Sequence, residues 1–210
     1  MKNKKVLFLT QNALLTALVL LLSFVPQIGY IKLPILAIQA TTVHIPVIVG
    51  SILLGWKSGA FLGGVFGLTS LINNTTAPGL ISFCFSPFVS MGEGLGGSPL
   101  ALVVCFVPRI LCGILPYFVY KLLKNRCGDK LSCLFGGVVG SMTNTILVMG
   151  MIYLFFAQSY AAAKEIAVDA VFGAILSVVA TNGIGEAIIA ALLSSAVVIA
   201  VQKSGITKRG

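Results

Sequence analysis

The sequence predicts an all-α integral membrane protein with six transmembrane helices and both termini in the cytoplasm. Three observations support this fold class: an apolar composition, apolar stretches of membrane-spanning length, and a one-sided distribution of basic residues. Of the 210 residues, 58% are hydrophobic and only 9% are charged, and the mean hydropathy is +1.06. Soluble domains carry about 25% charged residues. We therefore expect residues 1–210 to form a single transmembrane domain.

Six apolar stretches are separated by charged residues, prolines or polar clusters. A hydrocarbon core of roughly 30 Å needs about 20 apolar residues in a helix. The predicted spans are 6–25, 43–55, 58–73, 100–123, 131–157 and 184–202. The second and third are short and are joined only by Trp56 and Lys57, so we expect them to be tilted or irregular and covered by protein.

The last apolar stretch, 166–202, is too long for one span. It is interrupted by Thr181, Asn182, Gly183 and Gly185, which favour a turn or a helix start over a helix interior. We predict a break there, with 166–180 forming a short helix on the outer side. A seventh span is the alternative, but the distribution of charge favours six.

Most basic residues lie in the termini and loops that the six-span topology places in the cytoplasm. Eleven of the 14 Lys and Arg residues fall there: Lys2, Lys4, Lys5, Lys57, Lys121, Lys124, Arg126, Lys130, Lys203, Lys208 and Arg209. Cytoplasmic loops of membrane proteins carry such an excess. Because these residues occur in short runs rather than on one polar face, they do not indicate a nucleic-acid partner.

Arg109 lies within the fourth predicted span, directly after Pro108. Its charge cannot be lost by deprotonation, and an ionisable group at membrane depth is expensive and usually functional. One interpretation is a substrate carboxylate or phosphate held by the guanidinium group. The other is a structural ion pair with Glu186.

Four further polar residues are candidates for substrate binding. Asn144 lies near the middle of the fifth span, where it bonds either a ligand or a neighbouring helix. Asn182 and Glu186 are one helical turn apart, and Glu186 could instead complement the positive end of the sixth helix. His44 opens the second span at the outer face, where an imidazole suits either a ligand or an aqueous boundary.

Two loops are predicted on the outer side, at 26–42 and 73–99. The second combines Phe83, Phe85 and Phe88 with a glycine-rich segment. Loops of this length are usually functional or disordered. We interpret them as a lid over a ligand, with a passive loop as the alternative.

The chain lacks the motifs of common enzymes. Neither G-x-x-x-x-G-K-[ST], H-E-x-x-H nor G-x-S-x-G occurs, so we expect neither ATP binding through a P-loop nor hydrolase activity. The five cysteines lack metal-ligand spacing, so we expect no metal and no cofactor. Ala13 and Ala17 place two small residues on one face of the first span, which makes this face a candidate surface for docking another membrane protein.

The run VHIPVIVGSILLGWKSGAFLGGVFGLTSLIN, from Val43 to Asn73, together with A-x-x-x-A in the first span, resembles the substrate-binding S components of energy-coupling factor (ECF) transporters of bacterial cytoplasmic membranes. The resemblance covers nearly the whole chain. It implies a substrate-binding domain that captures a water-soluble vitamin from outside. It also implies two kinds of partner, a transmembrane coupling protein and two cytoplasmic ATPases, with Ala13 and Ala17 facing the coupling protein.

Within this family, V-H-I-P at 43–46, VPRI around Arg109 and TNGIGEA around Glu186 are most similar to the pantothenate-type members. An intramembrane Arg suits a small carboxylate vitamin. S components for riboflavin, folate, cobalamin or pyrimidine precursors share the scaffold. The glycine-rich segment from Met91 to Ser98 departs from the family pattern. A membrane adaptor or assembly protein, and a self-sufficient or proton-coupled carrier, are the alternatives from other classes.

Overall fold

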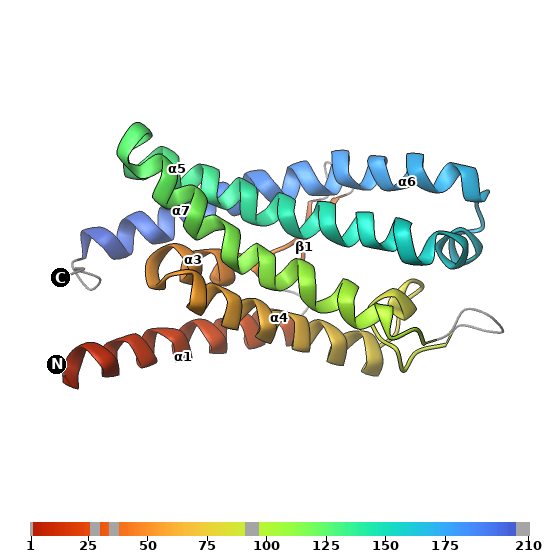
Figure 1. Cartoon of the computed structure of the whole chain (residues 1–210), viewed down its shortest axis with the longest axis horizontal. Helices are drawn as coiled ribbons and strands as arrows, with labels where there is room; N and C mark the ends of the chain where they lie inside the picture. Colours follow the sequence, from red (N-terminus) through yellow and green to blue (C-terminus); the bar gives the residue numbers. More distant parts are fainter. Residues whose placement is uncertain (1, 26–29, 34–37, 91–96, 205–210) are drawn as a thin grey trace.

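The chain is almost entirely helical in the residues that the computed structural model describes, which are 2–25, 30–33, 38–90 and 97–204 (Figure 1). The helices run roughly along the long axis of the molecule, and the start of α1 lies at the same end as the end of α7 (Figure 1). The elements are α1 (Lys2–Phe24), β1 (Tyr30–Leu33), β2 (Ile38–Thr41), α3 (His44–Leu54), α4 (Trp56–Thr76), the 3₁₀ turn η1 (Ser82–Cys84), α5 (Leu100–Lys164), the 3₁₀ turn η2 (Val168–Ala170), α6 (Val171–Val178), the π-helix η3 (Val179–Gly183) and α7 (Ile184–Lys203).

Helix α5 consists of two antiparallel arms. At Gly128 the backbone has φ 75° and ψ 170°, a conformation that favours glycine because it has no Cβ. The chain reverses direction there (Figure 1), so a first arm, 100–127, packs beside a second arm, 129–164. The two arms coincide with the predicted spans 100–123 and 131–157.

The predicted break between 180 and 184 is wrong. Helix α6 continues through the π-helix η3 into α7, and Gly183 has helical dihedrals of φ −61° and ψ −45°. A continuous helix keeps its backbone donors and acceptors paired inside the segment, which outweighs the turn preference of Thr, Asn and Gly in an apolar surrounding. The predicted short helix is therefore present as α6, but it forms one rod with the last span.

The predicted loop at 26–42 contains two short strands, in a fold that is otherwise helical as predicted. Strand β1 pairs with β2 in an antiparallel hairpin with Tyr30 opposite Thr41 and Leu33 opposite Ile38. Pairing satisfies the backbone groups of a segment that forms no helix. Residues 26–29 and 34–37 lie outside the described part of the chain.

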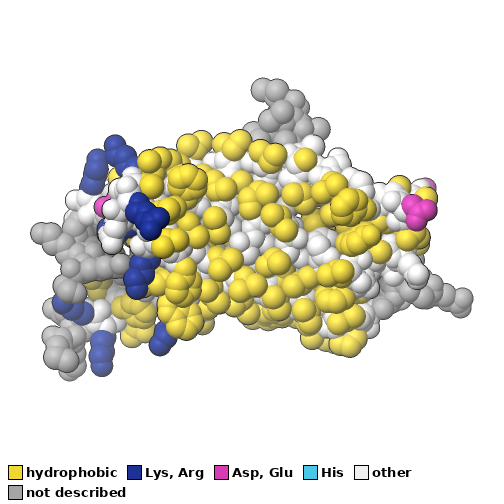
Figure 2. Space-filling view, turned by 45° about the horizontal axis from the view of Figure 1, so that its top comes forward, with side chains coloured by type: hydrophobic (Ala, Val, Ile, Leu, Met, Phe, Trp, Pro, Cys, Tyr) yellow, Lys and Arg dark blue, Asp and Glu magenta, His cyan; other side chains and the backbone are white. Residues whose placement is uncertain are grey.

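Three described segments are long and apolar enough to cross a membrane: Lys4–Phe24, Leu100–Lys164 with its two arms, and Val168–Lys203. Helix α3 is apolar but has only 11 residues. Apolar side chains cover the middle of the molecule (Figure 2), as expected for a surface in contact with lipid. The predicted number of six spans stays a prediction.

One end of the molecule carries most of the described basic side chains, and we call it the basic end (Figure 2). These residues belong to the starts of α1 and α4, the bend of α5 and the end of α7. The opposite end, which we call the far end, holds the connection between α5 and α6 (Figure 1), whose sequence includes Glu165 and Asp169. The described chain thus has the charge asymmetry that the sequence predicted.

Glycines allow α4 to lie directly against the first arm of α5. A Cβ on Gly59 would collide with the carbonyl oxygen of Gly113, and one on Gly63 would collide with the carbonyl oxygen of Arg109. Gly67 continues the stripe, and its carbonyl accepts a hydrogen bond from the Cys105 thiol at 3.2 Å. The sequence signal was the G-x-x-x-G-x-x-x-G spacing, which permits close helix packing.

We expect Gly63→Ala to lower the free energy of unfolding by about 1–3 kcal/mol, because the added methyl group overlaps with backbone that cannot rotate away. Gly64→Ala is the matched control, since no atom lies within 4 Å of its Cβ position and alanine favours a helix more than glycine does. Thermal unfolding in detergent measures both. Equal melting temperatures for the two variants would contradict the close contact.

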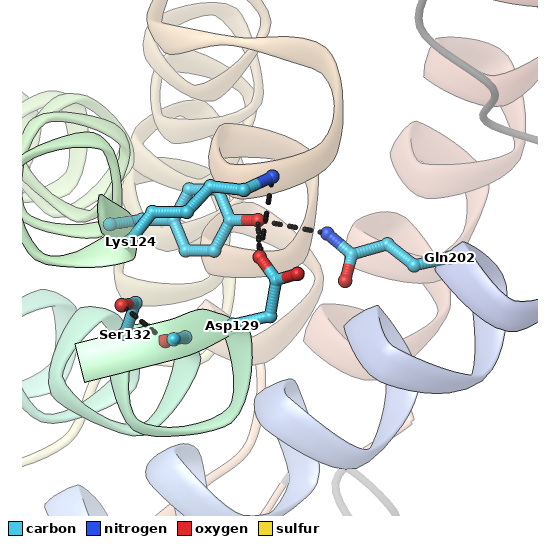
Figure 3. A network of polar contacts seen from close by, with 6 residues as sticks. Lys124, Asp129, Ser132 and Gln202 are labelled. Atoms are coloured by element: carbon cyan, nitrogen blue, oxygen red, sulfur yellow. Dashed lines mark hydrogen bonds and ion pairs between the residues drawn. The ribbon is translucent and has the colours of Figure 1, made fainter. Parts of the chain in front are cut away.

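A polar network at the basic end ties the bend of α5 to the end of α7 (Figure 3). The Tyr120 hydroxyl donates to Asp129 Oδ1 at 2.7 Å, and Gln202 Nε2 donates to the Tyr120 oxygen at 3.1 Å. Lys124 Nζ lies 3.3 Å from the same Asp129 oxygen. The pKa of Asp129 is lowered, mainly by the hydrogen bond from Tyr120 and to a smaller extent by the hydrogen bond and charge of Lys124.

We expect Asp129→Asn to destabilise the protein by about 0.2–1 kcal/mol at neutral pH, because the side chains of Asp129 and Lys124 are about half exposed to solvent. Since the folded state lowers the pKa of Asp129, its contribution is complete above the ordinary aspartate pKa of about 3.9 and is lost as the pH falls below it. Melting curves of both proteins across this range test the sign. A difference that grows on acidification would contradict it.

Candidate functional site

Of the three clusters of buried apolar side chains in the described chain, two that involve both arms of α5 lie at different depths in the molecule. The far cluster, towards the far end, comprises Phe83, Cys84, Ala101, Val104, Val148, Met149, Ile152, Phe156, Tyr160, Ala161, Val171 and Ile175. The near cluster, towards the basic end, comprises Ile45, Ile48, Val49, Ile52, Cys112, Tyr120, Cys133, Ala190 and Val198. Both are the kind of packed core that holds helices in place.

Between the two clusters lies a set of polar residues that we call the polar layer: His44, Arg109, Ser141, Asn144, Thr145, Asn182 and Glu186. Along each of three helical segments, a polar residue lies between a residue of the far cluster and a residue of the near cluster. Arg109 lies between Val104 and Cys112 in the first arm, and Asn144 lies between Val148 and Cys133 in the second arm. Glu186 lies between Ile175 and Ala190 in the rod formed by α6, η3 and α7. Helix α3 begins with His44 and continues into the near cluster with Ile45 and Ile48. The fold therefore brings the polar residues of four segments to one depth.

Glu186 is held from two sides of the polar layer. Its Oε1 accepts a hydrogen bond from the backbone N–H of Thr41 at 2.8 Å, and its Oε2 accepts one from the Thr145 hydroxyl at 3.3 Å. Only 9% of Glu186 is exposed. The carboxylate therefore links the end of β2, the second arm of α5 and the start of α7.

His44 is the most buried titratable residue of the layer, with 1% of its surface exposed. Neither ring nitrogen forms a hydrogen bond within the described chain. The imidazole lies close enough to Glu186 for the two groups to interact electrostatically. Ser141 Oγ and Asn144 Oδ1 are likewise buried and make no hydrogen bond to the described residues.

A buried polar atom without a hydrogen bond costs about 1–3 kcal/mol, and native proteins leave few of them. Here several such atoms belong to His44, Ser141 and Asn144 in one layer. Ser141, Asn144 and Thr145 share one face of the second arm by their spacing. This arrangement can donate hydrogen bonds to, and accept them from, a small polar ligand.

Arg109 stands at the part of the layer formed by the first arm and α4, and only 7% of it is exposed. Its Nη1 donates to the Val104 carbonyl at 2.8 Å, and its Nη2 lies 3.4 Å from the Ser70 hydroxyl. The guanidinium carbon is 5.5 Å from the ring centre of Phe66 and 5.1 Å from that of Phe85, within the range of cation–π attraction.

Glu186 has hydrogen-bond partners of its own in Thr41 and Thr145, and a structural ion pair with Arg109 stays the alternative interpretation. Cys112, a residue of the near cluster, lies three residues after Arg109 in the first arm, about one helical turn away. Arg109 and Glu186 bring opposite charges from two different segments, the first arm of α5 and the start of α7.

Asn182 and the two alanines occupy different settings. Asn182 is half-buried in η3, which packs against β2 and α5. Ala13 and Ala17 are exposed on α1, on the face that lies opposite the fully buried Val19. The structure thus leaves the alanine face open, whereas Asn182 is a half-buried member of the polar layer.

Sequence reasoning missed several contributors to the site. Thr145 and Ser141 lay in the same run as Asn144, and their spacing of three or four residues was the available signal. Ser70 and Phe66 carried no signal of their own, because only the packing of α4 on α5 brings them to Arg109. Phe85 was visible only as part of an aromatic loop.

The fold is that of a membrane protein with a layer of buried polar residues in its interior, and comparison with known proteins gives the family. Residues 7–198 match the substrate-specific component of ECF transporters, so the chain belongs to that family. It is a multi-pass protein of the bacterial cell membrane. The resemblance to this family stated from the sequence is confirmed.

Two curated relatives carry more specific names. The chain is 45% identical over 167 residues to the pantothenic acid transporter PanT of Lactococcus lactis subsp. cremoris, with 80% of each chain covered. It is 29% identical over 202 residues to the pantothenate transporter PanT of Leuconostoc mesenteroides subsp. mesenteroides, covering 94% of this chain and 93% of the relative. The similarity to pantothenate-type members is thereby confirmed.

Proposed function

We propose that this chain is the substrate-capture subunit of an ECF-type uptake transporter for pantothenate. The observation that carries the proposal is the polar layer, in which buried and unpaired atoms of His44, Ser141 and Asn144 lie between two apolar clusters. Membership of the family and the two PanT relatives support a vitamin carboxylate as the ligand.

The charge distribution supports an orientation with the basic end in the cytoplasm. Positively charged loops remain on the cytoplasmic side of membrane proteins, and the start of α1 and the end of α7 both lie at the basic end (Figures 1 and 2). We infer six spans with both termini inside. The far end then faces the outside, from which the ligand arrives.

The outer loop at 73–99 has the contacts expected of a lid. Phe83 and Cys84 are buried in the far cluster, and the Phe83 ring lies edge-on to Phe156 with centroids 6.2 Å apart. Phe85 covers the guanidinium group of Arg109. We infer that loops 26–42 and 73–99 close over the bound ligand. Residues 91–96, within the glycine-rich segment, lie outside the described chain.

Within the site, we assign Arg109 to the anionic group of the ligand, because a guanidinium group pairs with a carboxylate through charged hydrogen bonds. Asn144 and Asn182 are assigned hydrogen bonds to the ligand, and His44 and Glu186 complete the site. No reaction is assigned to these residues. The family points to a transport subunit, in which ATP hydrolysis belongs to the partner ATPases.

The experiment that tests the function is thermal unfolding of the purified protein against a panel of vitamins. A ligand at about 100 times its dissociation constant that binds only the folded state adds roughly 2.7 kcal/mol to stability. We expect pantothenate alone to raise the melting temperature. A selective shift with riboflavin, folate or a pyrimidine precursor would reassign the substrate. No shift in folded protein would favour an adaptor, and uptake into vesicles without partners or ATP would favour a self-sufficient carrier.

We also expect Ala17→Trp to abolish pantothenate uptake in cells that supply the coupling protein and the ATPases, while the purified variant still binds pantothenate. The reason is steric, since small residues permit close helix contact and Ala17 is exposed on α1. Leu18→Trp is the control on the same helix, because Leu18 is also exposed but projects away from the alanine stripe. Normal uptake by Ala17→Trp would exclude this face as the docking surface.

A further inference from the structure

The polar layer has opposite charges on its two sides, and this asymmetry bears on how a ligand lies within it. Arg109 belongs to the side formed by the first arm and α4, where Phe66 and Ser70 contact it. Glu186 belongs to the side formed by β2, the second arm and α7. The two arms of α5 pack against each other, with Gly140 of the second arm against Pro116 of the first, so a small molecule between the two sides would lie between the two charges.

The Glu186 side is built to receive hydrogen-bond donors. An ionised carboxylate accepts about four hydrogen bonds, and in the described chain Glu186 accepts one from Thr41 and one from Thr145. Asn144 Oδ1, also buried, is a further acceptor. A second carboxylate brought to this side would meet like charge in a region of low dielectric constant, where repulsion is strong.

His44 adds one donor and one acceptor to the same side. A neutral imidazole donates through one nitrogen and accepts through the other, and both nitrogens are buried without a hydrogen bond in the described chain. A hydroxyl group also donates and accepts. The pair formed by His44 and Glu186 therefore complements hydroxyl groups and excludes an anion.

The Arg109 side has the opposite preference. Its guanidinium group lies over the rings of Phe66 and Phe85, and Arg109 is nearly excluded from solvent, which strengthens its attraction for an anion. Its contact with Ser70, at 3.4 Å, is long for a hydrogen bond. A carboxylate could replace the hydroxyl as the acceptor.

From these observations we propose that the site fixes the direction of its ligand, with the hydroxyl-bearing end at His44 and Glu186 and the carboxylate at Arg109. The inference rests on the proposed function. Pantothenate has a carboxylate at one end, an amide in the middle and two hydroxyl groups at the other end, so it matches this polarity in one direction only. His44 and Glu186 are then the residues that determine specificity for the hydroxyl-bearing end.

The test combines two ligand changes with two protein changes in a binding titration of purified protein. Pantothenol replaces the carboxylate with an alcohol, and 4′-deoxypantothenate lacks the terminal hydroxyl. Arg109→Gln and Glu186→Gln change the two sides of the site. Arg126→Gln and Glu165→Gln are the matched controls, because both residues are exposed and remote from the polar layer.

We expect the wild type to bind pantothenol about 10- to 100-fold more weakly than pantothenate, the range of a lost charged hydrogen bond. In Arg109→Gln this difference should fall to less than about threefold, while the penalty for removing the hydroxyl persists. In Glu186→Gln the pattern should reverse, with the hydroxyl penalty lost and the carboxylate penalty kept. The controls should behave as the wild type.

Each failure has a distinct meaning. If the folded wild type binds no pantothenate, the proposed function fails. If it binds pantothenate but Glu186→Gln removes the carboxylate penalty, or Arg109→Gln removes the hydroxyl penalty, the assigned direction is wrong. If either substitution weakens the binding of all three ligands by the same factor, that residue does not recognise the end of the ligand assigned to it. If Arg109→Gln does not fold, Arg109→Lys is tested in its place. If Arg109→Lys then binds pantothenol as much more weakly than pantothenate as the wild type does, the guanidinium group has no specific role in binding the carboxylate.

Discussion

The backbone contact between α4 and the first arm of α5 fixes the position of the buried arginine. Gly63 lies against the carbonyl group of Arg109, and no side chain separates the two helices at this point. Phe66 and Ser70 follow on the same face of α4, so the contact also places an aromatic ring and a hydroxyl group beside the guanidinium. A larger residue at position 63 would move the helices apart, and these partners would move with them.

The polar layer is stable because apolar packing encloses it on both sides. The far and near clusters each include residues of both arms of α5, and each extends into the rod formed by α6, η3 and α7. This packing holds His44, Ser141 and Asn144 in the layer even though their buried atoms without hydrogen bonds weaken the fold. A protein that keeps such a cost in its interior is expected to recover it on binding a ligand.

Much of this architecture could be predicted from local patterns. The apolar stretches at 100–123 and 131–157 mark the two arms, because a helix needs a set length to cross a bilayer. Arg109, Asn144 and Glu186 stood out as polar residues in apolar surroundings, and the structure places all three in the polar layer. The hairpin at β1 and β2 and the continuous rod through η3 were not predicted, since strand pairing and helix continuation depend on surroundings rather than on residue type alone.

The sequence by itself determined that the chain is a membrane protein and which of its segments carry positive charge. It also identified the few polar residues whose burial at membrane depth is energetically costly. These properties depend on composition and on the local order of residues. Only the tertiary structure decided the partners of those residues. Glu186 accepts hydrogen bonds from Thr145 and from the backbone of Thr41, which is 145 positions away in the chain. Such choices arise from how the helices pack, and no local pattern of residues encodes contacts over that separation.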